Sequence, residues 1–460
     1  MKIVVLNGSP KGDLSVTLQY ANFLAKAFPQ HEFKVHHIAQ RIKAIEAKQE
    51  EWDKVIADIQ SADGVLWAFP LYILLVHAHY KRFIELVFER GAQDAFAGKY
   101  AASLSTSIHF YDQTAHEYIR AVSEDLGMRF VESYSPEMTD LLEKPKQATL
   151  VQFGAHFLQA IQNQEPTLRQ FSPLIPREFI YEPGAALAPV STAGKKVVIV
   201  HDSCMPECNL ARMVERCRAA FSDDVTVVNL HDVDIKASCQ GCLQCGAAYH
   251  CAYEGKDGFI DFYQTQVMAA DILVFAGSIR DRYLSSRWKM CFDRSFFNTH
   301  TPVLVGKQLA FVISGPFSQL PNLKEVLTAW AEYQGANLVG FVGDEFGSSE
   351  EIDAQLNGLM ARAAEYALQG YMRPQTFLGI GGGLIFRDDI YGRLRPVFKA
   401  DHQAYVSSGF YDTFPQRHWR TQLLNAGAGF LLSIPRIQQE FRKRIKENMV
   451  APLKQVVSRE

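Results

Sequence analysis

Residues 2–17, KIVVLNGSPKGDLSVT, predict the fold of the first part of this chain. Ile3 to Leu6 form a continuous apolar run, which suits a strand buried on both faces of a sheet. A loop of Gly, Ser and Pro follows, and SVTLQYANFLAKAF (15–28) then carries apolar residues at helical spacing. Short apolar runs at 65–69 and 100–104 alternate with further helical segments. This alternation predicts an α/β fold with a doubly wound parallel sheet, flavodoxin-like in type.

The same pattern recurs later in the chain. KIVVLNGSP (2–10) resembles KKVVIVHDSC (195–204) at an offset of 194 residues, and FAGKYAASLSTS (96–107) resembles LVGKQLAFVISG (304–315) at an offset of 208. Self-similarity at such a period indicates two whole domains rather than a solenoid. The offset grows in the interval that holds a cysteine-rich loop. We therefore expect a tandem duplication whose second copy carries an inserted loop.

Four segments follow from this pattern. We expect a flavodoxin-like domain over 1–165, a Pro- and Gly-rich linker over 166–194, a second flavodoxin-like domain over 195–370 and a mostly helical C-terminal extension over 371–460. FLGIGGGL (377–384) lacks the G-x-G-x-x-G pattern and a βαβ context, so it predicts a flexible turn rather than a dinucleotide loop.

Composition excludes several classes of protein. The chain has 460 residues, 48% of them hydrophobic and 21% charged, as in globular proteins, and a net charge of -3 offers no field for nucleic acid or an anionic membrane. We find no secretory signal and no apolar stretch of ~20 residues that would span a bilayer. Eight cysteines without such a signal indicate thiol or metal chemistry in a reducing cytoplasm.

The loop after the first apolar run has the composition of an anion site. It lies at the carboxyl end of a strand and before a helix N-terminus, where unpaired N–H groups favour an anion. It has no Gly-Lys-Ser/Thr ending, so a monophosphate fits better than a nucleoside triphosphate. The residues offered are Gly8, Ser9, Lys11, Gly12, Ser15 and Thr17. An ordinary strand-to-helix turn is the alternative.

Four cysteines stand in the run CQGCLQCGAAYHC (239–251). Cys239, Cys242, Cys245 and Cys251 have the spacing C-x2-C-x2-C-x5-C, which is typical of a [4Fe–4S] cluster. Zinc sites more often use two separated Cys-x2-Cys pairs or mixed Cys/His ligands. Zinc and unmetallated thiols stay open as alternatives.

The first copy resembles the NADPH-dependent FMN reductase family on GSPKG (8–12) with Ser15 and Thr17, and on FPLYILLVHAHYKRFIE (69–85). The resemblance implies that Gly8, Ser9, Pro10, Lys11, Ser15 and Thr17 bind the FMN phosphate. It implies that Pro70, Leu71, Tyr72 and Ile73 flank the flavin ring, and that STSIHFYD (105–112), with Ser105, Thr106 and Ser107, forms a third flavin-contacting loop.

The second copy resembles the iron–sulfur flavoproteins of the same superfamily on its cysteine run. It departs from the flavin pattern, because HDSCMPECN (201–209) has Asp202 and Glu207 where the first copy has Gly and Lys. Carboxylates oppose a phosphate dianion, so we expect FMN in the first copy only. In that family the cluster of one subunit lies near the FMN of another. We therefore expect the cysteine loop to lie near Tyr72 and His109, with the two sheets related by an approximate two-fold axis.

Several other residues admit two interpretations. Cys204 and Cys208 are extra ligands, redox thiols or neither, and Cys217 and Cys291 are predicted core residues. One of four histidines near the flavin loops is expected to donate a proton. We predict that His109, together with Tyr72, is catalytic. These histidines are His77, His79, His109 and His116. Arg280, Arg282 and Arg287 form either a phosphate-binding cluster or a solvated rim.

The leading hypothesis is an oxidoreductase that couples NAD(P)H, as substrate, or a reduced carrier to a small acceptor through FMN and a [4Fe–4S] cluster. One alternative is a cluster-free NAD(P)H:FMN or quinone reductase with a zinc or thiol loop. Another is an electron carrier without a substrate of its own. Partners would be small-molecule or protein electron donors and acceptors, with a second copy of the chain as a further possibility. Neither the acceptor nor the choice between NADH and NADPH follows from the sequence.

Overall fold

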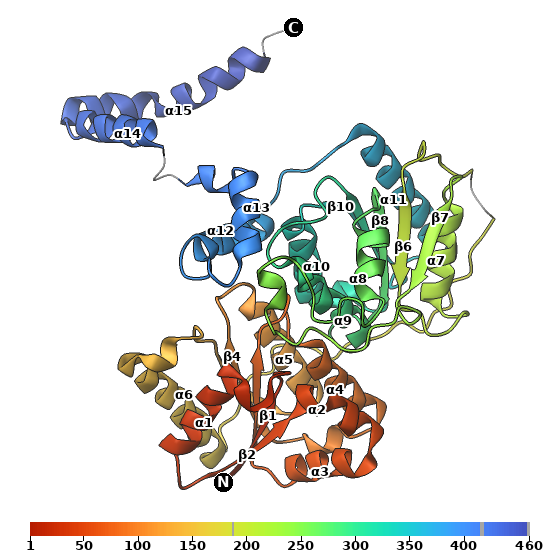
Figure 1. Ribbon diagram of the computed structural model, residues 1–460, viewed down its shortest axis with the longest axis vertical. Helices are drawn as coiled ribbons and strands as arrows, with labels where there is room; N and C mark the ends of the chain where they lie inside the picture. The colour runs from red at the N-terminus through yellow and green to blue at the C-terminus, as the bar shows by residue number, and fades with distance from the viewer. Residues whose placement is uncertain (186–187, 415–417, 458–460) are drawn as a thin grey trace. The chain divides into compact units, whose positions relative to one another are not determined.

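The computed structural model describes residues 1–185, 188–414 and 418–457, and it divides into two compact units, 1–401 and 402–460. The first unit contains two parallel sheets of five strands, each flanked by helices (Figure 1). The predicted tandem α/β architecture is therefore confirmed. Residues 186 and 187 of the predicted linker lie outside the described residues.

The first sheet has the strand order β2-β1-β3-β4-β5. Helices α1 and α6 pack on one face, where Ile3, Val5 and Leu66 meet Leu24 and Phe157. On the other face the Trp67 ring lies 5.9 Å from the ring of Tyr80 in α4. The strands are β1 (Lys2–Asn7), β2 (Glu32–His37), β3 (Gly64–Pro70), β4 (Tyr100–Thr106) and β5 (Arg129–Tyr134), and the helices are α1 (Val16–Ala27), α2 (Ile38–Ala47), α3 (Gln49–Gln60), α4 (Ala78–Glu89), α5 (Asp112–Asp125) and α6 (Lys144–Gln162).

The second sheet repeats this topology in the order β7-β6-β8-β9-β10. Helices α7 and α11 cover one face, and the predicted core residue Cys217 lies there, fully buried. Cys291 is also buried, as predicted. The strands are β6 (Val197–His201), β7 (Val225–Asn229), β8 (Ile272–Ser278), β9 (Gln308–Ser314) and β10 (Asn337–Gly343), and the helices are α7 (Asn209–Ala219), α8 (Phe259–Phe262), α9 (Ser286–Ser295), α10 (Pro321–Tyr333) and α11 (Ser349–Gln369). Short 3₁₀ or π helices are η1 (Gly12–Leu14), η2 (Gln93–Ala95), η3 (Asp140–Leu142), η4 (Gln244–Gly246), η5 (Tyr263–Val267), η6 (Phe296–Asn298) and η7 (Phe317–Gln319).

The two domains meet through α4 and α9, which are equivalent helices at the offset of 208 residues. The backbone N–H of Ala78 donates to Asp293 Oδ2 at 2.8 Å, and the N–H of Ser286 donates to Glu85 Oε1 at 2.6 Å. Each helix N-terminus is thus bound by a carboxylate of the other helix. Such reciprocal contacts between equivalent helices are those of an isologous interface, and they support the expected two-fold relation of the two sheets, which stays a prediction.

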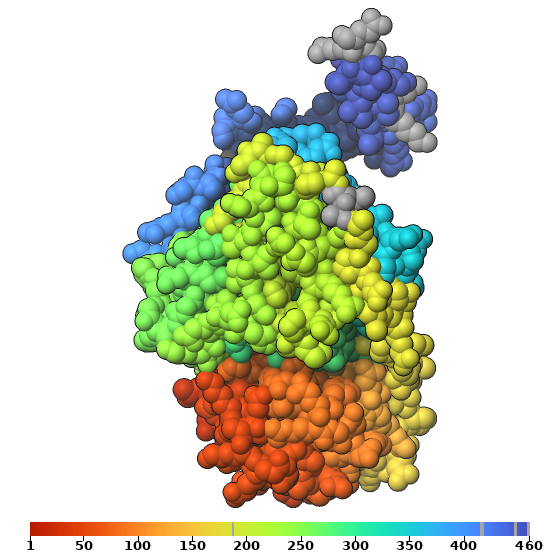
Figure 2. Space-filling view, turned by 90° about the vertical axis from the view of Figure 1, so that its right-hand side faces the viewer, coloured from red at the N-terminus to blue at the C-terminus, as the bar shows by residue number. Residues whose placement is uncertain are grey.

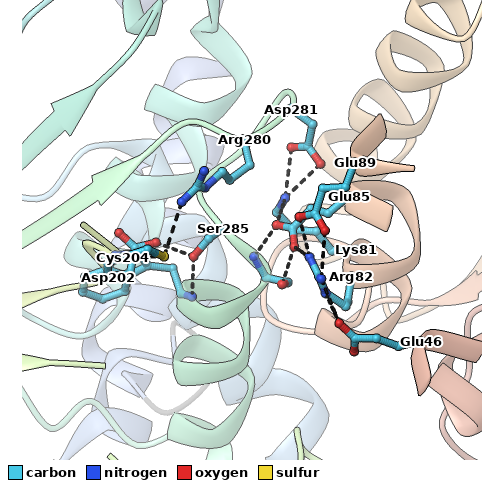
Figure 3. Close-up of polar contacts among 12 residues, drawn as sticks. Glu46, Lys81, Arg82, Glu85, Glu89, Asp202, Cys204, Arg280, Asp281 and Ser285 are labelled. Carbon is cyan, nitrogen blue, oxygen red and sulfur yellow. Dashed lines mark hydrogen bonds and ion pairs between the residues drawn. The ribbon is translucent and has the colours of Figure 1, made fainter. Parts of the chain in front are cut away.

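Buried charges hold this interface together. Lys81 Nζ lies 3.0 Å from Glu85 Oε1 and 2.9 Å from Asp281 Oδ2, and its side chain is fully buried. Figure 3 shows Lys81 between the two carboxylates, and Figure 2 shows the second domain resting on the first. The equivalent Lys289 pairs with Asp293. A buried pair fixes a geometry, because either partner left alone would be an uncompensated charge.

The segment after the second domain corrects one expectation. FLGIGGGL (377–384) is not a flexible turn but the first half of helix α12 (Phe377–Tyr391). Its glycines allow close packing: a Cβ at Gly382 would overlap the Phe110 ring, and a Cβ at Gly379 would lie 2.8 Å from Glu332 Cβ. Helix α12 therefore packs against α10 and the first domain.

The second unit is helical. Helix α13 (Lys399–Ser407) leads into it, and it contains η8 (Phe410–Thr413), α14 (Trp419–Leu432) and α15 (Pro435–Val457). Within the described residues, none of the helices has the length and apolar character needed to cross a membrane.

Candidate functional site

The loop after β1 is shaped by its own side chains. Asn7 Oδ1 accepts from the Ser9 N–H at 3.1 Å, and Ser9 Oγ accepts from the Lys11 N–H at 3.2 Å. Ser15 then caps α1, because its hydroxyl accepts from the Leu18 N–H. These bonds fold the loop over the start of α1, where backbone N–H groups favour an anion.

A second loop follows β3, and we call residues 70–75 the ring loop. Tyr72 and Leu75 exchange backbone hydrogen bonds of 2.8 and 3.1 Å, which close a tight turn. Ile73 and Leu74 have φ values of 33° and 64°, unusual for such side chains. Strained backbone of this kind clusters at functional sites.

A third loop follows β4. Thr106 and Ser107 belong to the same surface, whereas Ser105 turns away and bonds His116 Nε2 at 2.9 Å. His116 is also bonded by Ser103, and burial lowers its pKa to about 4, so it is a neutral structural imidazole. The catalytic candidate His109 pairs with Asp112 at 2.9 Å, and its side chain is 47% exposed.

These three loops line one cavity of about 420 Å³. The predicted flavin-contacting residues that line it are Ser9, Lys11, Ser15, Pro70, Leu71, Tyr72, Ile73, Thr106 and Ser107. His109 is not among the described residues that line this cavity, although its neighbours Ile108 and Phe110 are. Gly8 instead packs on Tyr80, where a Cβ would lie 2.8 Å from Cγ, and Thr17 bonds Thr106 at 2.6 Å.

The cavity continues into the second domain, a part of the site that sequence reasoning missed. We call the rings that line it there the aromatic wall: Phe296, His300, Trp330, Tyr333, Phe386 and Phe398. His300 Nδ1 lies 2.9 Å from Asp401 Oδ2, and its ring stacks on Phe386 at 4.0 Å. No local motif marks these residues, because they come from η6, α10, α12 and the segment before α13.

The four predicted ligand cysteines converge on one small cavity beside the large one. We call residues 239–251 the cysteine loop. Its four cysteines share this small cavity with Arg294 and Phe296. Burial raises the pKa of Cys239 and of Cys245 to about 12, and neighbouring sulfurs add to this. Within the described residues, no group of three or more His, Cys, Asp or Glu side chains has metal-site geometry. Thiol donors that converge on one cavity are suited to a metal centre. The positions of their side chains are not those of cysteines that hold a metal, so binding would require the side chains to reorient.

The cysteine loop lies against the ring loop. Gly241 has a φ of 61°, and a Cβ there would overlap the Tyr72 hydroxyl and lie 3.0 Å from Lys11 Cε. Cys239 and Gly241 both line the large cavity. The expected proximity of the cysteine loop to Tyr72 is therefore observed.

Two buried histidines connect the start of α4 to the cysteine loop by hydrogen bonds. His77 Nε2 lies 2.9 Å from the Cys239 carbonyl oxygen, while its Nδ1 accepts from the His79 N–H. His79 Nδ1 bonds the Ala39 carbonyl, and its Nε2 accepts from the Ser238 N–H at 3.3 Å. Each ring donates once and accepts once, so both are neutral. Burial accordingly lowers the pKa of His77 strongly and that of His79 to about 4.

The three arginines do not form one cluster. Arg282 is buried and pairs with Asp125 Oδ1 at 2.6 Å. Arg287 donates to the carbonyls of Leu230 and Val233. Arg280 alone is exposed. Two of the three therefore have structural roles, and a phosphate-binding cluster is not formed.

The fold and the cavity define a flavodoxin-like protein with a ligand site at the carboxyl ends of β1, β3 and β4. Residues 1–138 match the family model described as NADPH-dependent FMN reductase. The first domain is therefore similar to the NADPH-dependent FMN reductases over these residues.

Solved structures to which this chain is similar include an apo NADH:FMN oxidoreductase (EMOB), which is 22% identical over 35% of this chain and 89% of its own, with a TM-score of 0.30. FerB, a flavoenzyme NAD(P)H:(acceptor) oxidoreductase from Paracoccus denitrificans, is 19% identical over 35% of this chain and 97% of its own, with a TM-score of 0.29. General stress protein 14 from Treponema denticola, in complex with FMN, is 11% identical over 36% of this chain and 99% of its own, with a TM-score of 0.27. A comparison with curated proteins gives no match.

Proposed function

We propose that this chain is an oxidoreductase that binds FMN in the large cavity, binds a [4Fe–4S] cluster in the cysteine loop, and couples NAD(P)H or a reduced carrier to a small acceptor. The observation that carries the proposal is that one cavity is lined by the three first-domain loops and by Cys239 and Gly241 of the cysteine loop. FMN exchanges electrons in pairs or singly and a cluster singly, so neighbouring sites suit a relay between the two.

The roles assigned to the chain's own residues follow from their positions. Ser9, Lys11 and Ser15 would hold the phosphate, and the ring loop would flank the flavin ring. The aromatic wall excludes water from the acceptor side, and Asp401 fixes the orientation of His300, to which we assign proton transfer to the acceptor. The earlier candidates Tyr72 and His109 stay predictions. The four cysteines would supply iron ligands as thiolates.

Cofactor analysis of anaerobically purified protein tests this proposal. We expect one FMN per chain, with iron and acid-labile sulfide that are lost in Cys242→Ser. Lys11→Met should weaken FMN binding by about 1–3 kcal/mol, because a charge-assisted contact is lost. Ser203→Ala, in the equivalent loop of the second domain, is the matched control and should leave FMN binding unchanged.

Other outcomes select the alternatives. Turnover of NAD(P)H without iron would favour the cluster-free reductase with a zinc or thiol loop, and bound cofactors without turnover would favour an electron carrier. Two tightly bound flavins per chain, or FMN binding that depends on Ser203 and not on Lys11, would contradict the assigned site.

A further inference from the structure

The second domain carries a separate cluster of reactive groups where its flavin phosphate loop would be. Cys204 is exposed, and its Sγ lies 3.3 Å from His231 Nε2 and 3.6 Å from Arg280 Nη2. Figure 3 shows Arg280 reaching to Cys204. The three residues follow β6, β7 and β8, so they meet at the carboxyl ends of adjacent strands, where open sheets bind ligands.

Two nitrogen-bearing side chains contact the Cys204 sulfur. An imidazole and a guanidinium beside an exposed cysteine are the kind of surroundings in which nucleophilic cysteines are found. The contact is built into the fold, because Asn229 Nδ2 donates to the Ser203 carbonyl at 2.9 Å while its Oδ1 accepts from the His231 N–H. This ties the loop after β7 to the loop that holds Cys204.

A buried carboxyl group lies beside this thiol. Asp202 is 1% exposed, and its Oδ2 accepts from the Ser285 hydroxyl. Its Oδ1 is buried and has no hydrogen-bond partner within the described residues. Figure 3 shows the carboxyl group next to Cys204, whose Sγ lies 3.6 Å from the Asp202 carbonyl.

A second thiol stands four residues later. Cys208 is the N-cap residue of α7, and its side chain makes no capping hydrogen bond. Ser203 Oγ lies 3.5 Å from its Sγ, so the loop turns back toward Cys208.

We propose that Cys204 and Cys208 form a redox-active dithiol that reduces small hydroperoxides, apart from the flavin site. The Cys204 thiolate attacks a peroxide oxygen, the O–O bond breaks, and the leaving alkoxide or hydroxide takes a proton and departs as alcohol or water. Cys204 is then a sulfenic acid. The Cys208 thiol attacks its sulfur, the S–S bond forms, the S–O bond breaks, and water leaves. Two thiols thus supply the two electrons that reduce the peroxide.

Hydrogen peroxide and peptide mass spectrometry of the full chain test this site. We expect one equivalent of peroxide to give a disulfide between Cys204 and Cys208 that dithiothreitol reverses. Cys208→Ser should instead accumulate a dimedone adduct on Cys204. His231→Gln and Arg280→Met should each slow the reaction about 10-fold, because they remove the two side chains that contact the Cys204 sulfur. The buried Cys217 is the internal control and should stay unmodified.

Three results would overturn this assignment. The first is a Cys204 that reacts no faster in the folded chain than in the urea-unfolded chain. The second is a Cys204 adduct without any disulfide to Cys208 in the wild-type chain. The third is reaction confined to the cysteine loop.

A different observation concerns the helical hairpin of α14 and α15. Its helices expose a row of large apolar side chains, with Trp419 65% and Phe430 71% exposed. The others are Leu423, Leu424, Leu431, Ile434, Ile437, Phe441, Met449, Val450, Leu453, Val456 and Val457. Apolar patches of this extent mark interaction surfaces.

The charges of the hairpin indicate what it contacts. Residues 418–457 contain seven Lys and Arg residues against two glutamates. A second copy on the same face would bring these cations together, whereas an anionic surface would neutralise them. Trp, Phe and Leu combined with Arg and Lys are typical of helices that lie in the interface of anionic bilayers. We infer that the hairpin binds an anionic membrane surface without spanning it, through a local positive charge that the net charge of -3 of the whole chain does not reveal.

Trp419 provides the readout, because the other four tryptophans, Trp52, Trp67, Trp288 and Trp330, are buried. With the full chain, vesicles containing phosphatidylglycerol should shift the Trp emission to the blue and co-sediment the protein, and salt should weaken both effects. Vesicles of phosphatidylcholine alone should bind less. Leu423→Asp with Phe430→Asp should abolish binding, whereas Leu142→Asp, at an equally exposed position in η3, should not.

If the full chain does not bind vesicles that contain phosphatidylglycerol, the inference is wrong. If light scattering then shows a dimer that Leu423→Asp with Phe430→Asp dissociates, a second copy covers the face. If the chain is monomeric and Trp419 is shielded from acrylamide, the face is covered within the chain.

Discussion

Gly241 of the cysteine loop lies directly against the hydroxyl of Tyr72 on the ring loop, and Lys11 approaches the same side of it. This contact joins the loop that would hold the cluster to two of the residues that would hold FMN. The hydrogen bonds that His77 and His79 make to Cys239 and Ser238 hold the cysteine loop in this position beside the ring loop. The proposed cofactors would therefore be neighbours within one chain.

The contact predicts the effect of a single methyl group. In Gly241→Ala, the added Cβ would overlap the Tyr72 hydroxyl, so the ring loop or the cysteine loop must shift at a cost of about 1–3 kcal/mol. We expect weaker FMN binding, measured by fluorescence titration, and a lower Tm. Gly255→Ala is the matched control: its φ is also positive, at 70°, but no atom lies within 4 Å of the added Cβ. Equal effects of the two variants would contradict a specific contact at Gly241.

The domain interface predicts a large loss of stability from one buried lysine. Lys81→Met would leave Asp281 buried without its cation and Glu85 with Arg82 as its remaining cation, which costs about 3–5 kcal/mol. We expect a clearly lowered Tm in calorimetry. Arg41→Met, which breaks a surface pair with Glu51, should cost at most about 1 kcal/mol. A Lys81→Met chain as stable as Arg41→Met would show that the pair does not hold the domains together.

Buried neutral histidines predict loss of stability in acid. The pKa of His79 and of His116 is lowered to about 4 in the folded chain, so the unfolded chain takes up protons first as the pH falls. The free energy of unfolding should therefore be highest above about pH 6.5 and fall toward pH 4, by about 1.4 kcal/mol per pH unit for each group. Tm measured against pH gives the slope.

His116→Gln should flatten this slope, because the substituted residue no longer titrates. His156→Gln, at a position where the imidazole is 66% exposed, serves as control and should leave the slope unchanged. A slope that is the same in wild type and His116→Gln would show that His116 does not contribute.

The sequence predicted those parts of the site that depend on short-range patterns. The apolar run before GSPKG gives β1 and its loop, the internal repeat gives the second sheet, and the cysteine spacing gives a loop whose four sulfurs converge. These features are local, so each can be recognised in a short window. The position of the cysteine loop followed from the repeat offset, because the insertion stands in one copy only.

Other features depend on contacts between residues that lie too far apart to fall within one short stretch of sequence. The aromatic wall brings together residues about 100 positions apart, such as His300 and Phe398. The glycines of 377–384 suggest a turn by composition, but in the folded chain they allow α12 to approach Phe110 and Glu332. Tertiary packing here overrides the low helix propensity of glycine. For the same reason Arg282 and Arg287 look like a surface cluster in sequence, although the fold pairs each one separately.

The close packing of α12 predicts a separation between acceptor binding and flavin binding. In Gly382→Ala, the added Cβ would overlap the Phe110 ring, which lines the cavity together with Phe386 of the same helix. The aromatic wall must then move, so we expect a raised KM for a small acceptor while the FMN affinity stays unchanged. Gly381→Ala is the control on the same helix, because its Cβ would meet only the Phe377 ring, at 3.3 Å. Steady-state kinetics at saturating NAD(P)H, together with FMN titration, separates the two effects. A loss of FMN affinity with unchanged KM would show that this wall contacts the flavin rather than the acceptor.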